Sequence, residues 1–135
     1  MALGGGSEVT VLLLDTHALV WAWRQPDLLS DTVRQALADP GVTALVSAVS
    51  AYEIDHKRAR DPALLGLPDD IAAFALETGF LLAPITVPEA AAAARLPPVH
   101  RDPWDRLLVA QAQARGAQLV TMDRTIPAYG VPVLW

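Results

Sequence analysis

The chain has 135 residues, no cysteine and a formal net charge of −5 at pH 7, with 53% hydrophobic and 19% charged residues. This length and composition are typical of one globular domain, and the lack of cysteine excludes disulfides, thiolate zinc sites and thiol catalysis. The acidic balance argues against passive binding to a nucleic-acid duplex, which needs a basic face.

The sequence shows no sign of a membrane or secretion signal, and its first residues differ from the rest. No apolar run is long enough for a transmembrane helix, and the start of the chain lacks the basic and then apolar order of a signal peptide. We therefore expect a cytoplasmic protein with no membrane partner. Residues 1–8, MALGGGSE, are expected to be a flexible leader or a cloning remnant, which leaves 9–135 as a single domain.

The first half of the chain alternates short apolar runs with helical patterns. Residues 9–14 form a continuous apolar run, which is typical of a strand covered on both faces. Ser30 is a suitable N-cap for one helix, and the Asp61-Pro62 pair ends another. The expected elements are a strand at 9–14, a helix at 18–23, a helix from Ser30 to about Asp39, a strand at 43–46 and a helix that opens at Ser47 or Ser50 and runs to Arg60.

The second half repeats this alternation. Its clearest helix has Asp102 as N-cap, Pro103 at the first helical position and Gly116 as the stop after Arg115. The other expected elements are a helix within 68–78, a strand at 80–85, an alanine-rich helix at 88–95 and strands at 118–121 and 131–134. Strands that alternate with helices predict an α/β fold, a three-layer sandwich with a central parallel sheet flanked by helices.

Four acids stand near the ends of the expected strands. Asp15 follows the first strand, Thr121 and Asp123 end the strand that begins at 118, Asp105 lies in the first turn of the helix before that strand, and Glu53 lies early in the helix after the second strand. The carboxyl ends of parallel strands share one edge, where such sheets bind ligands. Clustered carboxylates repel one another unless divalent cations lie between them, and oxygen ligands suit Mg²⁺ or Mn²⁺. Such a cluster is suited to metal-assisted phosphodiester hydrolysis.

Each acid also has a structural interpretation. Asp15 can be the N-cap of the following helix, Glu53 can close a capping box that starts at Ser50, Asp105 can serve the start of its own helix, and Asp123 can belong to a polar turn. Spacing alone leaves these alternatives open.

Four motifs, in this order, resemble those of PIN-domain ribonucleases, specifically VapC-type toxins of bacterial toxin–antitoxin pairs. They are LLLDTHALVWAW, SAVSAYEIDHKR, LPPVHRDPWDRLLVAQA and LVTMDRTIPAYGVPVLW, and the resemblance spans about Val9 to Trp135. It implies a PIN-like fold and a Mg²⁺- or Mn²⁺-dependent endoribonuclease. It places Asp15, Glu53, Asp105 and Asp123 at the acidic, metal-binding quartet and Thr121 at the catalytic hydroxyl position.

The resemblance also implies partners. These are an RNA substrate, a cognate VapB-type antitoxin that blocks the groove, and a second copy of the chain in a homodimer. The apolar segment from Leu64 to Leu76 exceeds what one buried stripe requires, so part of it is expected to cover a partner or a second subunit.

Other polar and aromatic residues are expected to play lesser parts. The histidines lack the one-turn pairing of a metal site, and we expect hydrogen-bonded or surface positions for His17, His56 and His100. The tryptophans are expected to fill the core or the groove wall rather than to stack on RNA bases: Trp21, Trp23 and Trp104. Three arginines stand beside the acids in the sequence, and we expect them to be ordinary surface residues rather than phosphate ligands: Arg101, Arg106 and Arg124.

Three other functions compete with the nuclease. A haloacid-dehalogenase-type phosphohydrolase needs an aspartate where this chain has His17, and a phosphoryl-accepting receiver domain needs a late lysine, whereas the only lysine is Lys57. A catalytically inactive PIN-like binding module is the non-enzymatic alternative. The complete set of acids favours the nuclease.

Overall fold

The computed structural model describes residues 9–135, so the prediction for residues 1–8 lies outside the described residues. One parallel sheet has the strand order β3-β2-β1-β4-β5. Its strands are β1 (Thr10–Leu14), β2 (Val42–Ser47), β3 (Leu81–Ala83), β4 (Gln118–Val120) and β5 (Val133–Leu134). The helices are α1 (Thr16–Arg24), α2 (Asp31–Ala38), α3 (Ala48–Lys57), α4 (Ile71–Glu77), α5 (Val87–Ala94) and α6 (Pro103–Ala114), with short 3-10 turns η2 (Pro26–Leu28), η3 (Pro62–Leu64) and η4 (Ile126–Tyr129).

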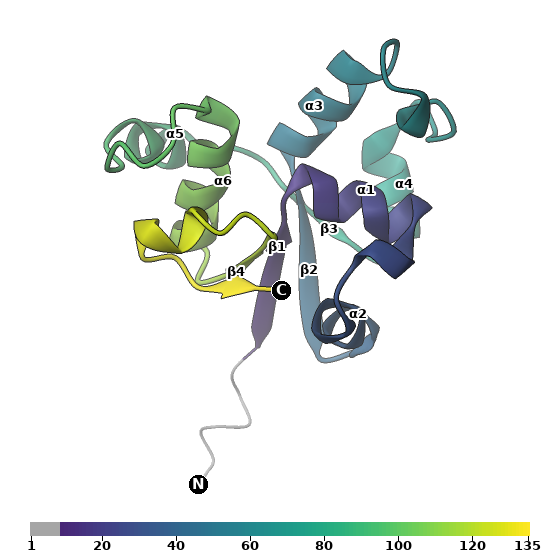
Figure 1. Cartoon of the computed structure of the whole chain (residues 1–135), viewed down its shortest axis with the longest axis horizontal. Coiled ribbons are helices and arrows are strands. Elements are labelled where there is room, and N and C mark those ends of the chain that lie inside the picture. Colours follow the sequence, from purple (N-terminus) through teal and green to yellow (C-terminus); the bar gives the residue numbers. More distant parts are fainter. Residues whose placement is uncertain (1–8) are drawn as a thin grey trace, which may run out of the picture.

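Helices cover both faces of the sheet. In Figure 1, α1, α2 and α4 lie on one side of the central strands, and α5 and α6 lie on the other. Successive residues of β1 point to opposite faces, so Leu12 and Leu14 pack in the cluster under α1, whereas Leu13 packs with Leu108 and Val109 of α6. All three leucines are fully buried. The predicted three-layer α/β sandwich is therefore confirmed.

The strand order creates a crevice between β1 and β4. From β1 the chain moves outward to β2 and β3, then returns to place β4 on the other side of β1, with β5 beyond it. Ligands of parallel sheets bind where the order reverses in this way, at the carboxyl ends of the strands. The backbone N–H of Asp15 donates a 3.0 Å hydrogen bond to the Val120 carbonyl, which holds these two strand ends together.

Several helix starts follow the capping residues of the sequence, and one prediction is wrong. Asp102 is the N-cap of α6 and accepts a hydrogen bond from Trp104 N, as predicted. For α3 the N-cap is Ser47, whose hydroxyl accepts from Val49 N. The alternative of a capping box between Ser50 and Glu53 is therefore wrong, since both residues lie inside the helix.

Element boundaries shift elsewhere for local reasons. The first helix begins at Thr16 rather than at 18, because Asp15 caps it. In the fourth helix the cap is Asp70, so the helix does not reach back to 68. The strands β3 and β5 are shorter than the predicted 80–85 and 131–134.

The apolar segment from Leu64 to Leu76 divides between core and surface. Leu64 and Ile71 are buried in the cluster under α1, whereas the exposed fractions of Leu65 and Leu76 are 66% and 54%. In the part of the chain that the structure describes, no helix has both the length and the apolar character that a membrane crossing requires.

Candidate functional site

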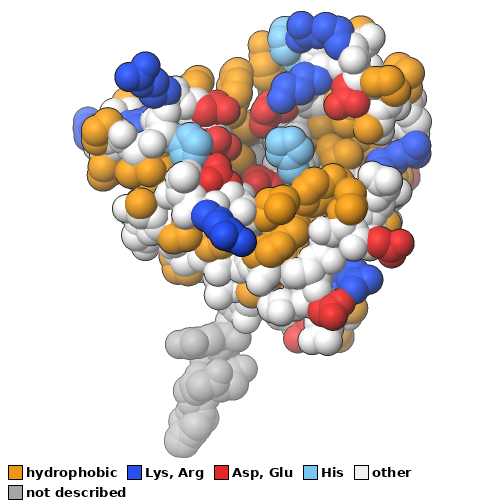
Figure 2. Space-filling model, in the orientation of Figure 1, with side chains coloured by type: hydrophobic (Ala, Val, Ile, Leu, Met, Phe, Trp, Pro, Cys, Tyr) orange, Lys and Arg blue, Asp and Glu red, His pale blue; other side chains and the backbone are white. Residues whose placement is uncertain are grey.

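A cavity of about 530 Å³ opens at the carboxyl ends of β1 and β4. Figure 2 shows acidic side chains gathered in a hollow between two lobes, with lysine, arginine and histidine side chains around it. The cavity is lined by all five residues predicted from the sequence, which are Asp15, Glu53, Asp105, Thr121 and Asp123. They come from the start of α1, the middle of α3, the first turn of α6 and the segment after β4.

Asp15 is held by the backbone of α1 and by β4. Its Oδ1 accepts a 2.8 Å hydrogen bond from Ala18 N, so the residue caps the helix while it lines the cavity. Burial raises the pKa of Asp15, and the negative charge of Glu53 adds to that effect, while the hydrogen bonds from Thr121 and Ala18 oppose it. The structural and functional interpretations of Asp15 therefore coexist.

Thr121 connects two of the acids. It is only 2% exposed, and its Oγ1 accepts a 3.0 Å hydrogen bond from Asp123 N. The same hydroxyl acts to lower the pKa of Asp15. This buried hydroxyl therefore helps to fix the segment after β4, which carries Asp123.

Glu53 is oriented across the cavity by α1. Thr16 Oγ1 donates a 2.6 Å hydrogen bond to Glu53 Oε1, and Lys57 Nζ lies 3.3 Å from Oε2. Thr16 also lies 3.0 Å from the buried hydroxyl of Ser50. Sequence reasoning missed Thr16, because its role depends on α3 packing against α1 and no local pattern reports that contact.

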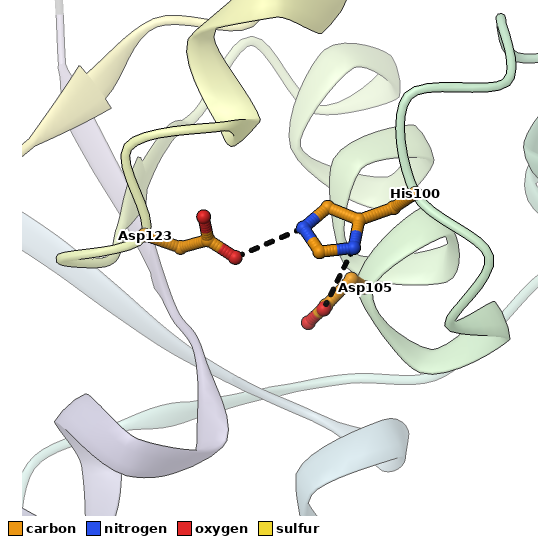
Figure 3. Close-up of side chains that lie close together, drawn as sticks. All are labelled: His100, Asp105 and Asp123. Atoms are coloured by element: carbon orange, nitrogen blue, oxygen red, sulfur yellow. Dashed lines mark hydrogen bonds and ion pairs between the residues drawn. The ribbon is translucent and has the colours of Figure 1, made fainter.

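His100 lies between two of the acids (Figure 3). Its Nε2 hydrogen-bonds Asp123 Oδ2 at 3.0 Å, and its Nδ1 is 4.0 Å from Asp105 Oδ2. Sequence reasoning expected a hydrogen-bonded or surface histidine and did not place it at the site. The available signal was its position in the same motif as Asp105, five residues earlier.

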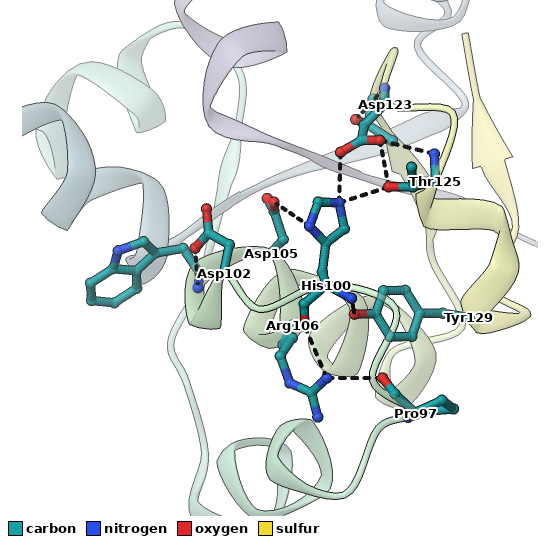
Figure 4. A network of polar contacts seen from close by, with 10 residues as sticks. Pro97, His100, Asp102, Asp105, Arg106, Asp123, Thr125 and Tyr129 are labelled. Atoms are coloured by element: carbon teal, nitrogen blue, oxygen red, sulfur yellow. Dashed lines mark hydrogen bonds and ion pairs between the residues drawn. The ribbon is translucent and has the colours of Figure 1, made fainter.

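A wider network fixes the loop that carries His100 (Figure 4). The His100 N–H donates a 2.7 Å bond to the Tyr129 hydroxyl, and Thr125 Oγ1 lies 2.7 Å from His100 Nε2. Arg106 donates 2.9 Å and 3.3 Å bonds to the carbonyls of Pro97 and His100. Arg106 is therefore engaged with the backbone of this loop rather than free for phosphate.

The charges of the acids act on one another. The pKa of Asp105 is raised to about 6, chiefly by burial and further by the charges of Asp102, Asp123 and Asp15, against a decrease from His100. Burial alone would raise the pKa of Asp123 as well, but hydrogen bonds from Thr125 and His100 lower it. Carboxylates crowded in this way are relieved by a cation.

The donor set fits a hard divalent cation. Among residues 9–135, one group of three acidic or histidine side chains has its ligand atoms all within 4.8 Å of one another, namely His100, Asp105 and Asp123. Asp15 and Glu53 line the same cavity without belonging to that group. Carboxylate oxygens with an imidazole suit Mg²⁺ or Mn²⁺, and Asp105 with its raised pKa is a carboxylate that a cation would keep ionised.

The fold is a parallel α/β sandwich with acidic side chains clustered at the switch point of the sheet. Comparison of the sequence with known protein families identifies the family that has this arrangement. The family model of the PIN domain matches residues 12–131, so the chain belongs to the PIN domain family. A curated relative, ribonuclease VapC22 of Mycobacterium tuberculosis, is 32% identical over 130 residues, which cover 92% of this chain and 95% of the relative.

Solved structures share the fold. The Mycobacterium tuberculosis toxin VapC20, described as cleaving the sarcin-ricin loop, superposes with a TM-score of 0.66 at 18% identity, covering 91% of this chain and 98% of that one. The VapBC2 structure from Rickettsia felis, bound to a promoter DNA fragment, gives 0.66 at 13% identity over 93% and 98%. A toxin–antitoxin complex from Klebsiella pneumoniae gives 0.63 at 22% identity over 92% and 96%.

Proposed function

We propose that this protein is a metal-dependent endoribonuclease toxin of a toxin–antitoxin pair, which hydrolyses RNA phosphodiester bonds. The observation that carries the proposal is the convergence of Asp15, Glu53, Asp105 and Asp123 on one cavity at the switch point of the sheet. The 32% identity to a relative named as a ribonuclease supports this choice of reaction.

The proposed roles follow from the geometry. Asp105 and Asp123 would hold Mg²⁺ or Mn²⁺, with Asp15 and Glu53 completing the acidic wall around it. A bound divalent cation supplies charge neutralisation at the phosphate and a more acidic water.

Two threonines and a histidine would act as positioning residues. Thr121 holds Asp15 and Asp123, and His100 holds Asp123. The buried hydroxyl of Thr121, which accepts a hydrogen bond from Asp123 N, supports this role. Thr16 holds Glu53 through its 2.6 Å hydrogen bond.

An RNA cleavage assay tests the proposal directly. We expect cleavage with Mg²⁺ or Mn²⁺, none with a chelator, and a loss of about 10²- to 10⁴-fold in Asp105→Asn and Glu53→Gln. The matched control is Glu77→Gln, which makes the same chemical change at an exposed acid of α4, outside the cavity. Cleavage that persists in both site variants, or in the presence of chelator, would contradict the proposal.

The same assay separates the alternatives. A catalytically inactive PIN-like module would bind its protein partner and leave RNA intact whatever the metal. The phosphohydrolase alternative is not favoured, because the chain belongs to the PIN domain family and has His17 where that enzyme needs an aspartate.

A cognate antitoxin of the VapB type is the proposed protein partner. The complex from Klebsiella pneumoniae among the structural neighbours supports a partner of this kind. An inhibitor that enters a cavity lined by six carboxylates would present positive charge to it. An RNA substrate would place the action of the toxin in the cytoplasm. Co-expression with candidate VapB-type antitoxins, followed by co-purification and loss of cleavage, tests this partner.

A homodimer is the proposed assembly. The strand β3 lies at an edge of the sheet and exposes Leu81 and Leu82 by 54% and 41%, and Val87 follows with 84% exposed. An apolar sheet edge of this kind suits contact with a second copy. Light scattering after gel filtration should give a dimer for the wild type and a monomer for Leu81→Lys. A monomeric wild type would contradict the proposed dimer.

A further inference from the structure

One side of the cavity is lined by apolar and aromatic side chains rather than by carboxylates. These side chains include Val20, Trp21, Met122 and Trp135. The ring centroids of Trp21 and Trp135 are 5.9 Å apart, and those of His17 and Trp21 are 6.0 Å apart. Figure 2 shows a continuous apolar patch next to the acidic hollow. We call these four apolar residues together with His17 the aromatic wall.

The aromatic wall is built on the same elements as the acids. His17 and Trp21 are one helical turn apart on α1, the helix that Asp15 caps, so they share a face of it. Met122 stands between Thr121 and Asp123. Trp135 follows β5, the neighbour of β4 in the sheet. The distance between the wall and the carboxylates is therefore fixed by the sheet and by one helix.

The side chains of the aromatic wall are more exposed to solvent than core side chains are. Trp21 and Trp135 are partly exposed and the exposed fraction of Met122 is 55%, although Trp21 and Trp135 also pack against the buried cluster under α1. Flat aromatic faces left open inside a polar cavity are suited to a ligand that has both an aromatic and an ionic part. A nucleotide is such a ligand, because its base has a π-face and its phosphate requires neutralisation.

We propose that the aromatic wall, with Trp21 at its centre, is a nucleobase subsite that holds a base next to the phosphate bound at the acids. This inference rests on the proposed function and names the residues that would bind a base of the RNA substrate. It departs from the expectation that Trp21 fills only the core or the groove wall.

A nucleobase fits the wall better than a protein segment does. The wall occupies one side of a cavity of about 530 Å³ that it shares with the carboxylates, which is the size of a small-ligand site. A docked helix would instead need an extended groove that receives several turns. The apolar cleft lined by Trp23, Phe74 and Phe80 lies apart from the acids, so the wall is not a continuation of it.

The test compares two ligands that differ only in the base. Uridine 5′-monophosphate and ribose 5-phosphate are titrated, with Mg²⁺, into the full-length wild type, and the indole N–H resonances are followed by NMR. We expect the nucleotide to bind at least about tenfold more tightly than ribose 5-phosphate. The resonances of Trp21 and Trp135 should move on nucleotide binding, whereas that of Trp23 should not.

Variants assign the effect to the wall. Trp21→Leu keeps apolar volume against the core and should bring the affinity ratio of the two ligands close to one. The matched control, Trp23→Leu, makes the same change in the other cleft and should keep the wild-type ratio. If Trp21→Leu fails to fold, Met122→Ser on the exposed loop replaces it: a smaller ratio supports the subsite, and an unchanged ratio overturns it.

The outcomes separate this inference from the proposed function. A wild type that cleaves RNA but binds both ligands equally overturns the subsite and leaves the nuclease standing. A ratio that survives in Trp21→Leu also overturns it, and loss of antitoxin binding in that variant would then identify the wall as a protein contact. Absence of RNA cleavage by the wild type counts against the nuclease, independently of the ligand ratio.

Discussion

Thr16 Oγ1 donates a 2.6 Å hydrogen bond to Oε1 of Glu53, and this contact joins the first turn of α1 to the middle of α3. It is the direct link between the helix that Asp15 caps and the acid from the opposite wall of the cavity. A hydrogen bond to a charged group contributes about 1.5–3 kcal/mol, more than a contact between neutral groups.

Removal of this hydroxyl should therefore release Glu53. We expect Thr16→Val to lower RNA cleavage about tenfold or more, because Glu53 loses one of its two hydrogen-bond partners in a partly buried place. Thr16→Ser keeps the hydroxyl and should retain most of the activity. Rates measured at saturating Mn²⁺ check this prediction, and equal losses in the two variants would contradict it.

The crowding at Asp105 predicts an effect on stability. Without metal at pH 7.5, Asp105→Asn should raise the melting temperature by about 3–5 °C, which corresponds to roughly 1 kcal/mol for a domain of this size. The neutral side chain removes repulsion from Asp15 and Asp123 and avoids the burial of a charge. The same change should reduce the stabilisation by Mn²⁺, because the native state loses a ligand. Differential scanning fluorimetry with and without Mn²⁺ measures both effects, and an unchanged response to metal would contradict the ligand role.

The raised pKa of Asp105 also predicts a pH dependence. Its folded-state pKa is about 6 against a model value of 3.8, so between these values the folded chain binds more protons than the unfolded chain. The Asp105 contribution should therefore stabilise the metal-free protein as pH falls from about 7 to about 4. Urea unfolding of wild type and Asp105→Asn across this range gives the difference. A difference that is flat with pH would show that Asp105 titrates normally.

The part of the site that the sequence predicted depends on local rules. Asp15 and Asp123 were found because they follow strands, and parallel strand ends share an edge. Asp102 was found because a capping residue followed by proline marks a helix start within a few residues. These signals need no knowledge of the strand order.

The rest of the site depends on contacts across the chain. His100 is fixed by Tyr129, 29 residues later, through a loop that has no hydrophobic period. The choice between Ser47 and Ser50, which the sequence leaves open, has a similar cause, because the Ser50 hydroxyl lies 3.0 Å from Thr16 on another helix while Ser47 caps α3. Long-range packing decides such choices after the local preferences of the sequence have been met.

The contact between His100 and Asp123 predicts a shift in the pH profile of cleavage. The histidine hydrogen bond helps to lower the pKa of Asp123, so His100→Ala should raise that pKa. Since Asp123 must be ionised to hold a cation, activity on the acidic side should be lost at a higher pH than in the wild type. Rates from about pH 4 to about pH 7 at subsaturating Mn²⁺ test this. A profile that keeps its acidic limb would restrict His100 to support of the loop.

The buried ion pair between Glu89 and Arg115 predicts a loss of stability without a loss of function. Glu89 is 5% exposed, its Oε2 lies 3.0 Å from Arg115 Nε, and it closes a capping box with Thr86 at the start of α5. Glu89→Gln should cost about 2 kcal/mol at pH 7, because Arg115 loses a charged partner in a partly buried place. Activity per folded molecule should stay at the wild-type level, because Glu89 lies outside the cavity.

The pH dependence of this ion pair has the opposite sign to that of Asp105. Burial would raise the pKa of Glu89, but the hydrogen bonds from Thr86 and Arg115 lower it below the model value of 4.5. The stabilisation is therefore present above about pH 4.5 and is lost as pH falls through the folded-state pKa. The difference in unfolding free energy between wild type and Glu89→Gln should be constant from pH 6 to pH 8 and should shrink below about pH 4.5. Chemical denaturation at these pH values measures it, and a difference that grows on acidification would mean that the pair does not lower this pKa.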